Sequence, residues 1–137
     1  MDRLFLDANV LFSAAYLQVN ALQGLWTLAN VELISSDVAR REAETNLAKK
    51  RPARLPNLAV LLQSVAAVPD APAGAVLPSG MQLPAKDEPI FLACQHAGAS
   101  HFLTGDAKHF GPYFDQSIGG VLIERPGTYL HRRLSSP

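Results

Sequence analysis

The sequence has little of what marks secreted, membrane-spanning or strongly charged proteins. It contains one cysteine, Cys94, so no internal disulfide can form, and this usage suits a reducing compartment. Its hydrophobic runs are short and interrupted, which argues against a membrane span, and its first residues lack the pattern of a signal peptide. It carries 12 basic and 12 acidic residues, so no overall field attracts polyanions. We therefore expect a cytoplasmic protein without a membrane partner, which would meet an anionic partner through a local patch.

Strand and helix signals alternate along the 137 residues, a length that fits a single domain, residues 1–137, with one core. Strands are predicted at Leu4–Leu6, Val31–Ser35, His101–Thr104 and Gly120–Ile123. Helices are predicted from Asp7 or Asn9 to Leu17, at 20–29, from Ser36 or Asp37 to about Lys50, early in 58–68, at Asp87–Ala97 and from about Arg125. Residues 65–68 fit either a helix or a strand, and the proline- and glycine-rich residues 69–85 predict a long surface loop. The alternation predicts an α/β fold with a parallel sheet and helices on both faces.

Four acidic residues stand at the ends of predicted elements or on a packed helix face: Asp7, Glu42, Asp87 and Asp106. Each has a simple structural explanation when taken alone. Asp7 and Asp87 can cap helices, Asp106 can serve a turn, and Glu42 can sit at the border of a buried helix face. In a parallel sheet, however, the carboxyl ends of the strands meet at one edge, where ligands bind. We therefore expect these carboxylates to share one pocket.

Such a cluster is unfavourable without compensation. Two carboxylates about 6 Å apart repel by roughly 3 kcal/mol at an effective dielectric constant near 20, so the group needs raised pKa values or a bound cation. Oxygen ligands suit Mg²⁺ or Mn²⁺, either of which can activate a water for attack on a phosphodiester. Asn9 and Thr104 are placed to position that water or a phosphate oxygen.

Four motifs occur in the order found in the PIN-domain superfamily. They are Leu6-Asp7-Ala8-Asn9-Val10-Leu11, Arg41-Glu42-Ala43-Glu44-Thr45-Asn46-Leu47, Lys86-Asp87-Glu88-Pro89-Ile90 and Leu103-Thr104-Gly105-Asp106-Ala107-Lys108-His109-Phe110. By these motifs nearly the whole chain resembles PIN-domain proteins, and among them the VapC-type ribonuclease toxins of toxin–antitoxin pairs.

The resemblance implies a three-layer α/β/α sandwich around a mainly parallel sheet, and a Mg²⁺- or Mn²⁺-dependent endoribonuclease. Asp7, Glu42, Asp87 and Asp106 would hold the metal and be catalytic, with Asn9 and Thr104 in support. Glu44 is a rival for the helix position, but it points about 200° away from Glu42 around the helix. Some relatives carry another acid shortly after the last motif, where this chain has His109. The resemblance also implies a homodimer and a small antitoxin partner.

Six of the basic residues lie between Arg40 and Arg54, which fits either a solvated helix face or a track for phosphates. The candidate RNA contacts in this run are Arg40, Arg41, Lys49, Lys50 and Arg51. Three histidines, His96, His101 and His109, match no usual zinc-site spacing and are interpreted as surface or satisfied residues. Tyr113 and Phe114 favour burial over stacking on bases.

Two other functions stay open at this stage. One is a haloacid-dehalogenase-like phosphohydrolase with Asp7 as the nucleophile, although Asn9 stands where that family has a second acid. The other is a catalytically inactive PIN scaffold that binds RNA or protein. The presence of all four acids favours the nuclease over the scaffold.

Overall fold

The computed structural model describes residues 1–135, and within them a six-stranded sheet has the order β3-β2-β1-β4-β6-β5. The strands are β1 (Asp2–Leu6), β2 (Val31–Ser36), β3 (Ala66–Val68), β4 (His101–Leu103), β5 (Gln116–Ile118) and β6 (Val121–Glu124). All neighbouring strands pair in parallel except β5 and β6, which pair antiparallel. The mainly parallel sheet confirms the α/β prediction.

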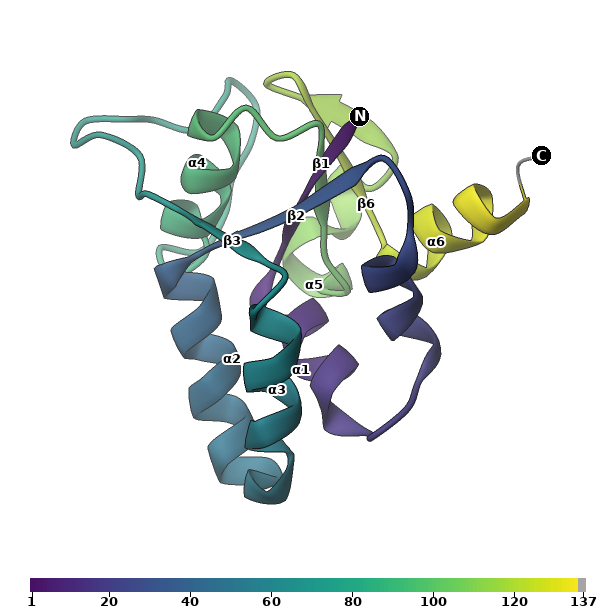
Figure 1. Cartoon of the computed structure of the whole chain (residues 1–137). Coiled ribbons are helices and arrows are strands. Elements are labelled where there is room, and N and C mark those ends of the chain that lie inside the picture. Colours follow the sequence, from purple (N-terminus) through teal and green to yellow (C-terminus); the bar gives the residue numbers. More distant parts are fainter. Residues whose placement is uncertain (136–137) are drawn as a thin grey trace.

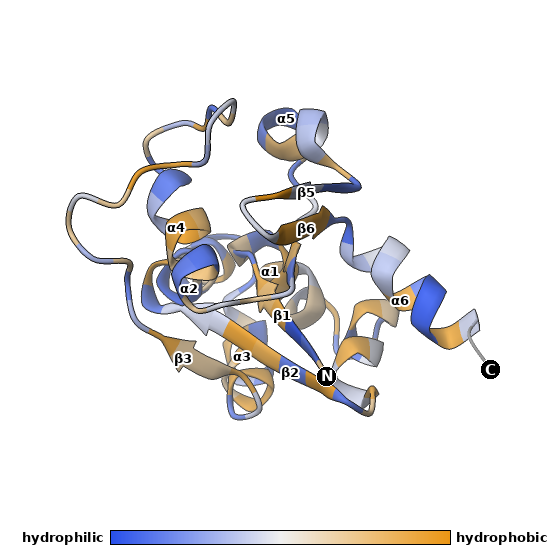
Figure 2. Ribbon diagram, turned by 90° about the horizontal axis from the view of Figure 1, so that it is seen from above, coloured by the Kyte–Doolittle hydropathy of each residue, from blue (hydrophilic) through white to orange (hydrophobic). Residues whose placement is uncertain are grey.

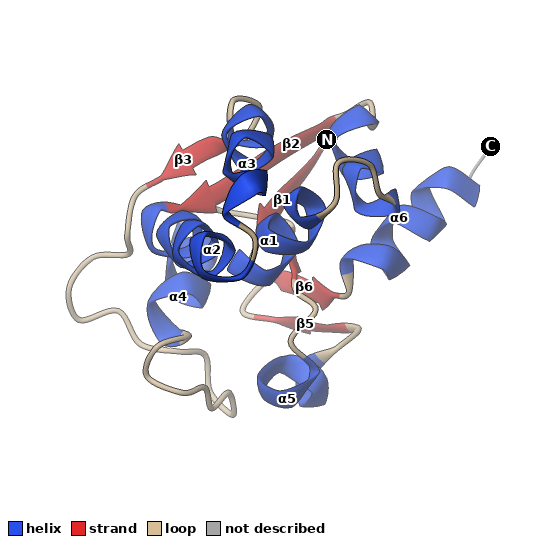
Figure 3. Cartoon of the chain, turned by 90° about the horizontal axis from the view of Figure 1, so that it is seen from below, coloured by secondary structure: helices blue, strands red, loops and turns tan. Residues whose placement is uncertain are grey.

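Helices cover both faces of this sheet and complete a three-layer α/β/α arrangement. They are α1 (Ala8–Tyr16), α2 (Asp37–Lys50), α3 (Leu55–Leu62), α4 (Glu88–His96), α5 (Ala107–Phe110) and α6 (Pro126–Ser135). Short 3₁₀ helices are η1 (Ala21–Thr27), η2 (Pro52–Arg54) and η3 (Gly111–Tyr113). Helices α1, α2 and α3 lie together on one face, and α4 lies on the other (Figures 1 and 3).

The core follows from the hydrophobic patterns of the sequence. Leu4, Phe5 and Leu6 of β1 are fully buried, as expected for a central strand covered on both faces. In α2 the buried residues Ala39, Ala43 and Leu47 recur every four positions, which places them on one side of the helix. Figure 2 shows hydrophobic residues along β2 and β6, in the middle layer. Local sequence periodicity therefore accounts for which face each element buries.

The strand order creates a switch point between β1 and β4. From β1 the chain builds outward through β2 and β3, and it then returns to place β4 on the other side of β1. Asp7 follows β1 directly, and its backbone N–H donates a 3.1 Å hydrogen bond to the carbonyl of Leu103, the last residue of β4. In open α/β sheets, ligands bind outside the carboxyl ends of the strands at such a point.

Two local features differ from the prediction. The helix predicted at 20–29 is present as the shorter 3₁₀ helix η1, in which Gly24 lies against the side chain of Leu130, and glycine disfavours an α-helix interior. The antiparallel strand β5 was not predicted. It forms a hairpin with β6 through Gly119 and Gly120, both at positive φ, and this Gly-Gly pair was a usable hairpin signal.

Residues 58–68 divide into the end of α3, which begins earlier at Leu55, and the strand β3, and residues 69–85 form the predicted long loop. The hydroxyl of Tyr113 holds this loop by accepting a 2.8 Å hydrogen bond from the N–H of Gln82 and donating one of 3.2 Å to its carbonyl. Met81 is buried in the core. The loop is thus packed against the domain. Within residues 1–135, no helix combines the length and apolarity that crossing a membrane requires.

Candidate functional site

The four predicted acids line one pocket of about 230 Å³ at the switch point. Asp7 comes from the end of β1, Glu42 from α2, Asp87 from the turn before α4, and Asp106 from the turn after β4. The pocket wall is completed by Asn9, Phe12, Asn46, Lys50 and Lys86. Side chains that are up to 99 residues apart in the sequence therefore share one cavity, as expected from the parallel topology.

Asp7 is held by hydrogen bonds to both of its carboxylate oxygens. Oδ1 accepts from the N–H of Ala8 at 2.8 Å, which makes Asp7 the N-cap of α1. Oδ2 accepts from the hydroxyl of Thr104 at 2.8 Å and from the side-chain amide of Asn9 at 3.0 Å. The same amide also donates to Thr104 Oγ1 at 3.1 Å, and Asn9 Oδ1 accepts from the N–H of Gly105 at 2.7 Å.

These contacts change what was expected of Thr104. Its hydroxyl donates to Asp7 and accepts from Asn9 and from the N–H of Asp106 at 3.1 Å, so its hydrogen-bonding capacity is used within the protein. Thr104 is also fully buried. Its place is to fix Asp7, and the expectation that it positions a water or phosphate directly was wrong.

Burial raises the pKa of Asp7 from 3.8 to about 6. The hydrogen bonds from Thr104 and Ala8 lower this pKa, whereas the nearby carboxylates of Glu42 and Asp87 raise it further. Burial likewise raises the pKa of Asp87, and Asp106 raises it too, while Lys86 and His109 act in the opposite direction. Keeping both carboxylates ionised at neutral pH is therefore unfavourable, and a bound cation would offset this cost.

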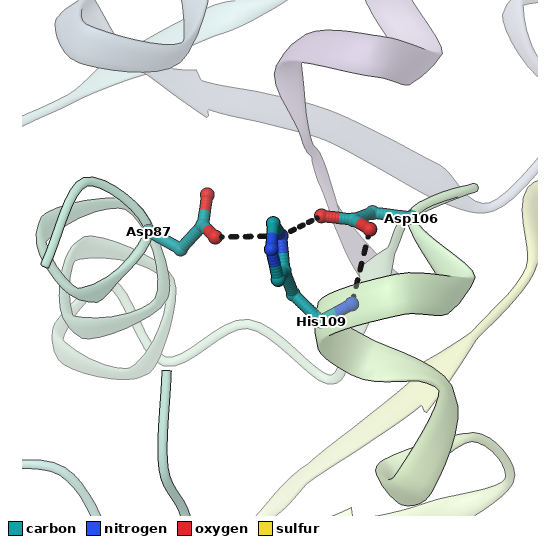
Figure 4. Close-up of side chains that lie close together, drawn as sticks. All are labelled: Asp87, Asp106 and His109. Atoms are coloured by element: carbon teal, nitrogen blue, oxygen red, sulfur yellow. Dashed lines mark hydrogen bonds and ion pairs between the residues drawn. The ribbon is translucent and has the colours of Figure 1, made fainter. Parts of the chain in front are cut away.

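Asp87, Asp106 and His109 form the tightest group in the pocket region, with one ligand atom from each lying within 4.8 Å of the others. His109 extends from α5 between the two carboxylates (Figure 4). Its Nδ1 atom lies 2.7 Å from Oδ2 of Asp106 and 3.2 Å from Oδ2 of Asp87. The backbone N–H of His109 also donates a 3.1 Å hydrogen bond to Oδ1 of Asp106, which caps α5.

Asp87 differs from Asp7 and Asp106 because its side chain caps no helix. Its Oδ2 is buried, and among residues 1–135 no group donates a hydrogen bond to it. His109 lies at ion-pair distance, but the geometry is not that of a hydrogen bond. A buried carboxylate oxygen left in this state is costly unless a cation contacts it. This group of two aspartates and a histidine can therefore hold a metal ion.

The structure separates the predicted acids into two sets. Asp87 and Asp106 belong to this tight group, whereas Asp7 and Glu42 line the same pocket without joining it. Glu42 lines the pocket and its rival Glu44 does not.

His109 was missed in the sequence, where the histidines were interpreted as surface or satisfied residues. The available signal was its spacing of three from Asp106, which places both side chains on one side of a helical turn.

Of the five predicted RNA contacts, Lys50 alone lines the pocket. Arg51 lies over the ring of Tyr16, and Arg41 pairs with Asp37 at 3.3 Å on the surface of α2. Lys49 is exposed beside Lys50. The remaining candidate, Arg40, is half-buried, and its Nε has no hydrogen-bond partner among residues 1–135. Except for Lys50, these basic residues therefore lie outside the pocket wall.

Comparison with known proteins adds no family assignment. No protein-family model matches the chain, and no curated protein matches it either. The resemblance to PIN domains stays a prediction that rests on the motifs and their order.

Proposed function

We propose that this protein is a metal-dependent endoribonuclease of the PIN type. The observation that carries the proposal is the meeting of Asp7, Glu42, Asp87 and Asp106 in one pocket at the carboxyl edge of the sheet, where a buried oxygen of Asp87 accepts no hydrogen bond from residues 1–135. Four carboxylates in one pocket serve poorly as structural groups, because their mutual repulsion opposes folding. They serve well as the ligands of a divalent cation that acts on a phosphodiester.

The donor set favours Mg²⁺ or Mn²⁺. Carboxylate oxygens are hard ligands, which both of these ions accept, and the imidazole of His109 adds a ligand that Mn²⁺ tolerates better than Mg²⁺. When bound, such an ion supplies a positive charge that polarises the phosphodiester and makes water a stronger nucleophile at neutral pH.

Other residues of the pocket orient the carboxylate ligands and attract the substrate. Asn9 and Thr104 fix the carboxylate of Asp7 through its Oδ2, so that Oδ1, which accepts one hydrogen bond from Ala8, is held in one orientation with a lone pair left for a ligand. Lys50 and Lys86 on the pocket wall offset part of the acidic charge and attract the phosphates of a substrate. In hydrolysis the oxygen of water bonds to phosphorus, the bond to the leaving oxygen breaks, and a carboxylate takes the proton that water loses.

The same contacts disfavour Asp7 as a phosphohydrolase nucleophile. Oδ2 accepts two hydrogen bonds from the protein and Oδ1 accepts one, so only one lone pair of the carboxylate is left for attack on phosphorus.

The family resemblance adds a biological role, a location and partners to the proposal. It supports a cytoplasmic toxin of a toxin–antitoxin pair, which acts as a homodimer and is blocked by a small antitoxin protein. These parts of the proposal rest on the motifs alone.

The test is cleavage of defined single-stranded RNAs in the presence of Mg²⁺, Mn²⁺ or EDTA. We expect cleavage with either ion and none with EDTA. Asp7→Asn and Asp87→Asn should each lower the rate by about 100-fold or more, because they remove charge from the pocket without removing volume. Asp70→Asn, at an exposed position in the long loop, is the matched control and should cleave normally. Full cleavage by purified, folded Asp7→Asn protein would contradict the proposal.

A further inference from the structure

We propose that the surface beside the pocket binds the unpaired bases of a single-stranded RNA, an inference that rests on the nuclease function proposed above. The surface is made by Phe12 and Tyr16 of α1 with Lys50 and Arg51 at the end of α2, and we call these four residues the aromatic strip. It assigns a base-binding role to two aromatic residues that lie outside the four acidic motifs.

The two rings of the strip stand one helical turn apart and lie side by side. Their centroids are 5.3 Å apart with an angle of 35° between the ring planes. Four residues of α-helix rise about 6 Å, so the spacing follows directly from the positions of Phe12 and Tyr16 in the helix. Tyr16 is 36% exposed, although nine-residue α1 buries most of its other apolar side chains.

A cation accompanies each ring. Lys50 Nζ lies 5.6 Å from the centroid of Phe12, and the guanidinium of Arg51 lies 5.1 Å from that of Tyr16. Arg51 is fixed in this place because its Nη1 donates a 3.0 Å hydrogen bond to the carbonyl of Tyr16. Figure 3 shows α1 and α2 side by side on the same face of the sheet. The strip thus places a positive charge beside each aromatic ring, and a hydrogen bond fixes that of Arg51.

The strip is continuous with the acidic pocket. Phe12 and Lys50 belong to both, since they also line the pocket wall. An RNA whose phosphodiester lies among the acids can therefore extend its neighbouring nucleotides over Tyr16 and Arg51. The two cations also reduce the repulsion between the four carboxylates of the pocket and a polyanionic RNA.

The chemistry of the strip favours unpaired bases over other partners. Bases stack on aromatic rings and on arginine guanidinium planes, and nearby cations contact the phosphates between them. A duplex keeps its bases stacked inside and offers none to the rings. A protein partner would bury Tyr16 together with the exposed Leu17 and Val19 that follow it, and this is the alternative that the experiment must separate.

The test measures binding by fluorescence anisotropy in EDTA, which prevents metal-dependent cleavage. The probes are a fluorescein-labelled polyadenosine RNA of about 12 nucleotides and a labelled RNA duplex of similar length. Loss of one stacking contact predicts at least about 5-fold weaker binding of the single strand by Tyr16→Ala. Tyr16→Phe keeps the ring and should bind normally, and neither variant should change duplex binding.

Arg133→Ala is the matched control for Arg51→Ala. Like Arg51, Arg133 covers a tyrosine, Tyr129, and donates to a backbone carbonyl, that of Ala29, at 2.8 Å. It lies near Asp2, at the start of β1 and therefore at the opposite edge of the sheet. Both variants remove one positive charge. We expect Arg51→Ala to weaken single-strand binding and Arg133→Ala to leave it unchanged, with melting temperatures recorded for every variant.

Hydrolysis of bis(p-nitrophenyl) phosphate with Mn²⁺ separates the two proposals, since this small diester has no base to place on the strip. Unchanged hydrolysis by Tyr16→Ala, with weaker RNA binding, supports the strip. Equal RNA binding by wild type and folded Tyr16→Ala, or no RNA binding by either, overturns it. A Tyr16-dependent dimerisation without RNA binding overturns it in favour of a protein interface. If RNA binding depends on Tyr16 but no diester is hydrolysed, the base-binding role of the strip is supported and the proposed nuclease function is contradicted.

Discussion

The hydroxyl of Thr104 donates a 2.8 Å hydrogen bond to Oδ2 of Asp7, joining residues that are 97 positions apart in the sequence. The bond links the ends of β1 and β4 at the switch point of the sheet. It also determines how the buried carboxylate faces the pocket and limits the rise of its pKa. The state of Asp7 therefore depends on the pairing of β1 with β4.

Replacing Thr104 with valine should destabilise the fold and raise the pKa of Asp7 further. Valine keeps the shape but leaves the N–H of Asp106 and one amide hydrogen of Asn9 without their acceptor, at a cost of about 1–3 kcal/mol in the free energy of unfolding. Urea denaturation measures this cost. Thr104→Ser retains the hydroxyl and should recover most of the stability, and an equally large loss in the serine variant would show that packing of the methyl group is what matters.

The ionisation of Asp7 should make stability fall as the pH rises through the acidic range. Burial raises its pKa from 3.8 to about 6, so the folded state holds a proton that the unfolded state has already released. The stabilisation is complete below about pH 4 and lost above about pH 6. The difference of about two units corresponds to about 3 kcal/mol in metal-free protein.

The measurement is urea denaturation in EDTA at several pH values, for wild type and for Asp7→Asn. Subtracting the two curves removes the contributions of the titrating groups that do not interact with Asp7. We expect Asp7→Asn to gain stability relative to wild type between about pH 4 and pH 6. Parallel curves across that range would show that Asp7 titrates normally.

His109 should influence which metal the pocket prefers. Its Nδ1 lies within reach of the carboxylates of Asp87 and Asp106, and imidazole nitrogen favours Mn²⁺ over the harder Mg²⁺. Calorimetric titration of His109→Ala should therefore show Mn²⁺ affinity falling by about 10-fold, with a smaller change for Mg²⁺. The backbone cap of α5 is retained, since it uses the N–H of residue 109. His96→Ala, at the exposed end of α4, is the control, and equal losses for both ions would argue against ligation by the ring.

Glu42 and Glu44 offer a matched pair on one helix. Glu42 lines the pocket, whereas Glu44 is exposed two residues later, about 200° around α2. Glu42→Gln should lower metal-dependent RNA cleavage by about 100-fold, and Glu44→Gln should leave it unchanged. Rates on one RNA under single-turnover conditions give the comparison. Loss of activity in the Glu44 variant instead would reverse the assignment made for this helix.

Some of the site was predictable because acids at the ends of strands and helices are visible in a linear pattern. Asp7 and Asp106 follow strands, and Asp87 precedes a helix that begins with proline in its first turn. The spacing of three indicates the contact of His109 with Asp106, but its contact with Asp87 was not visible, since it depends on α5 lying close to the start of α4. The role of Thr104 was misjudged for the same kind of reason, because its three hydrogen-bond partners come together only in the folded chain.

Sequence alone determined most of the elements of this protein and the side that each of them buries. The consecutive apolar residues Leu4–Leu6 indicate a strand that is buried on both faces. The four-residue spacing of Ala39, Ala43 and Leu47 indicates one buried helix face, because the periodicity of the backbone determines which side chains share a face. Only the tertiary structure decided that β4 lies beside β1. Strand order depends on contacts between distant segments, which no local pattern encodes, and the pocket, its histidine and the neighbouring aromatic strip all depend on that order.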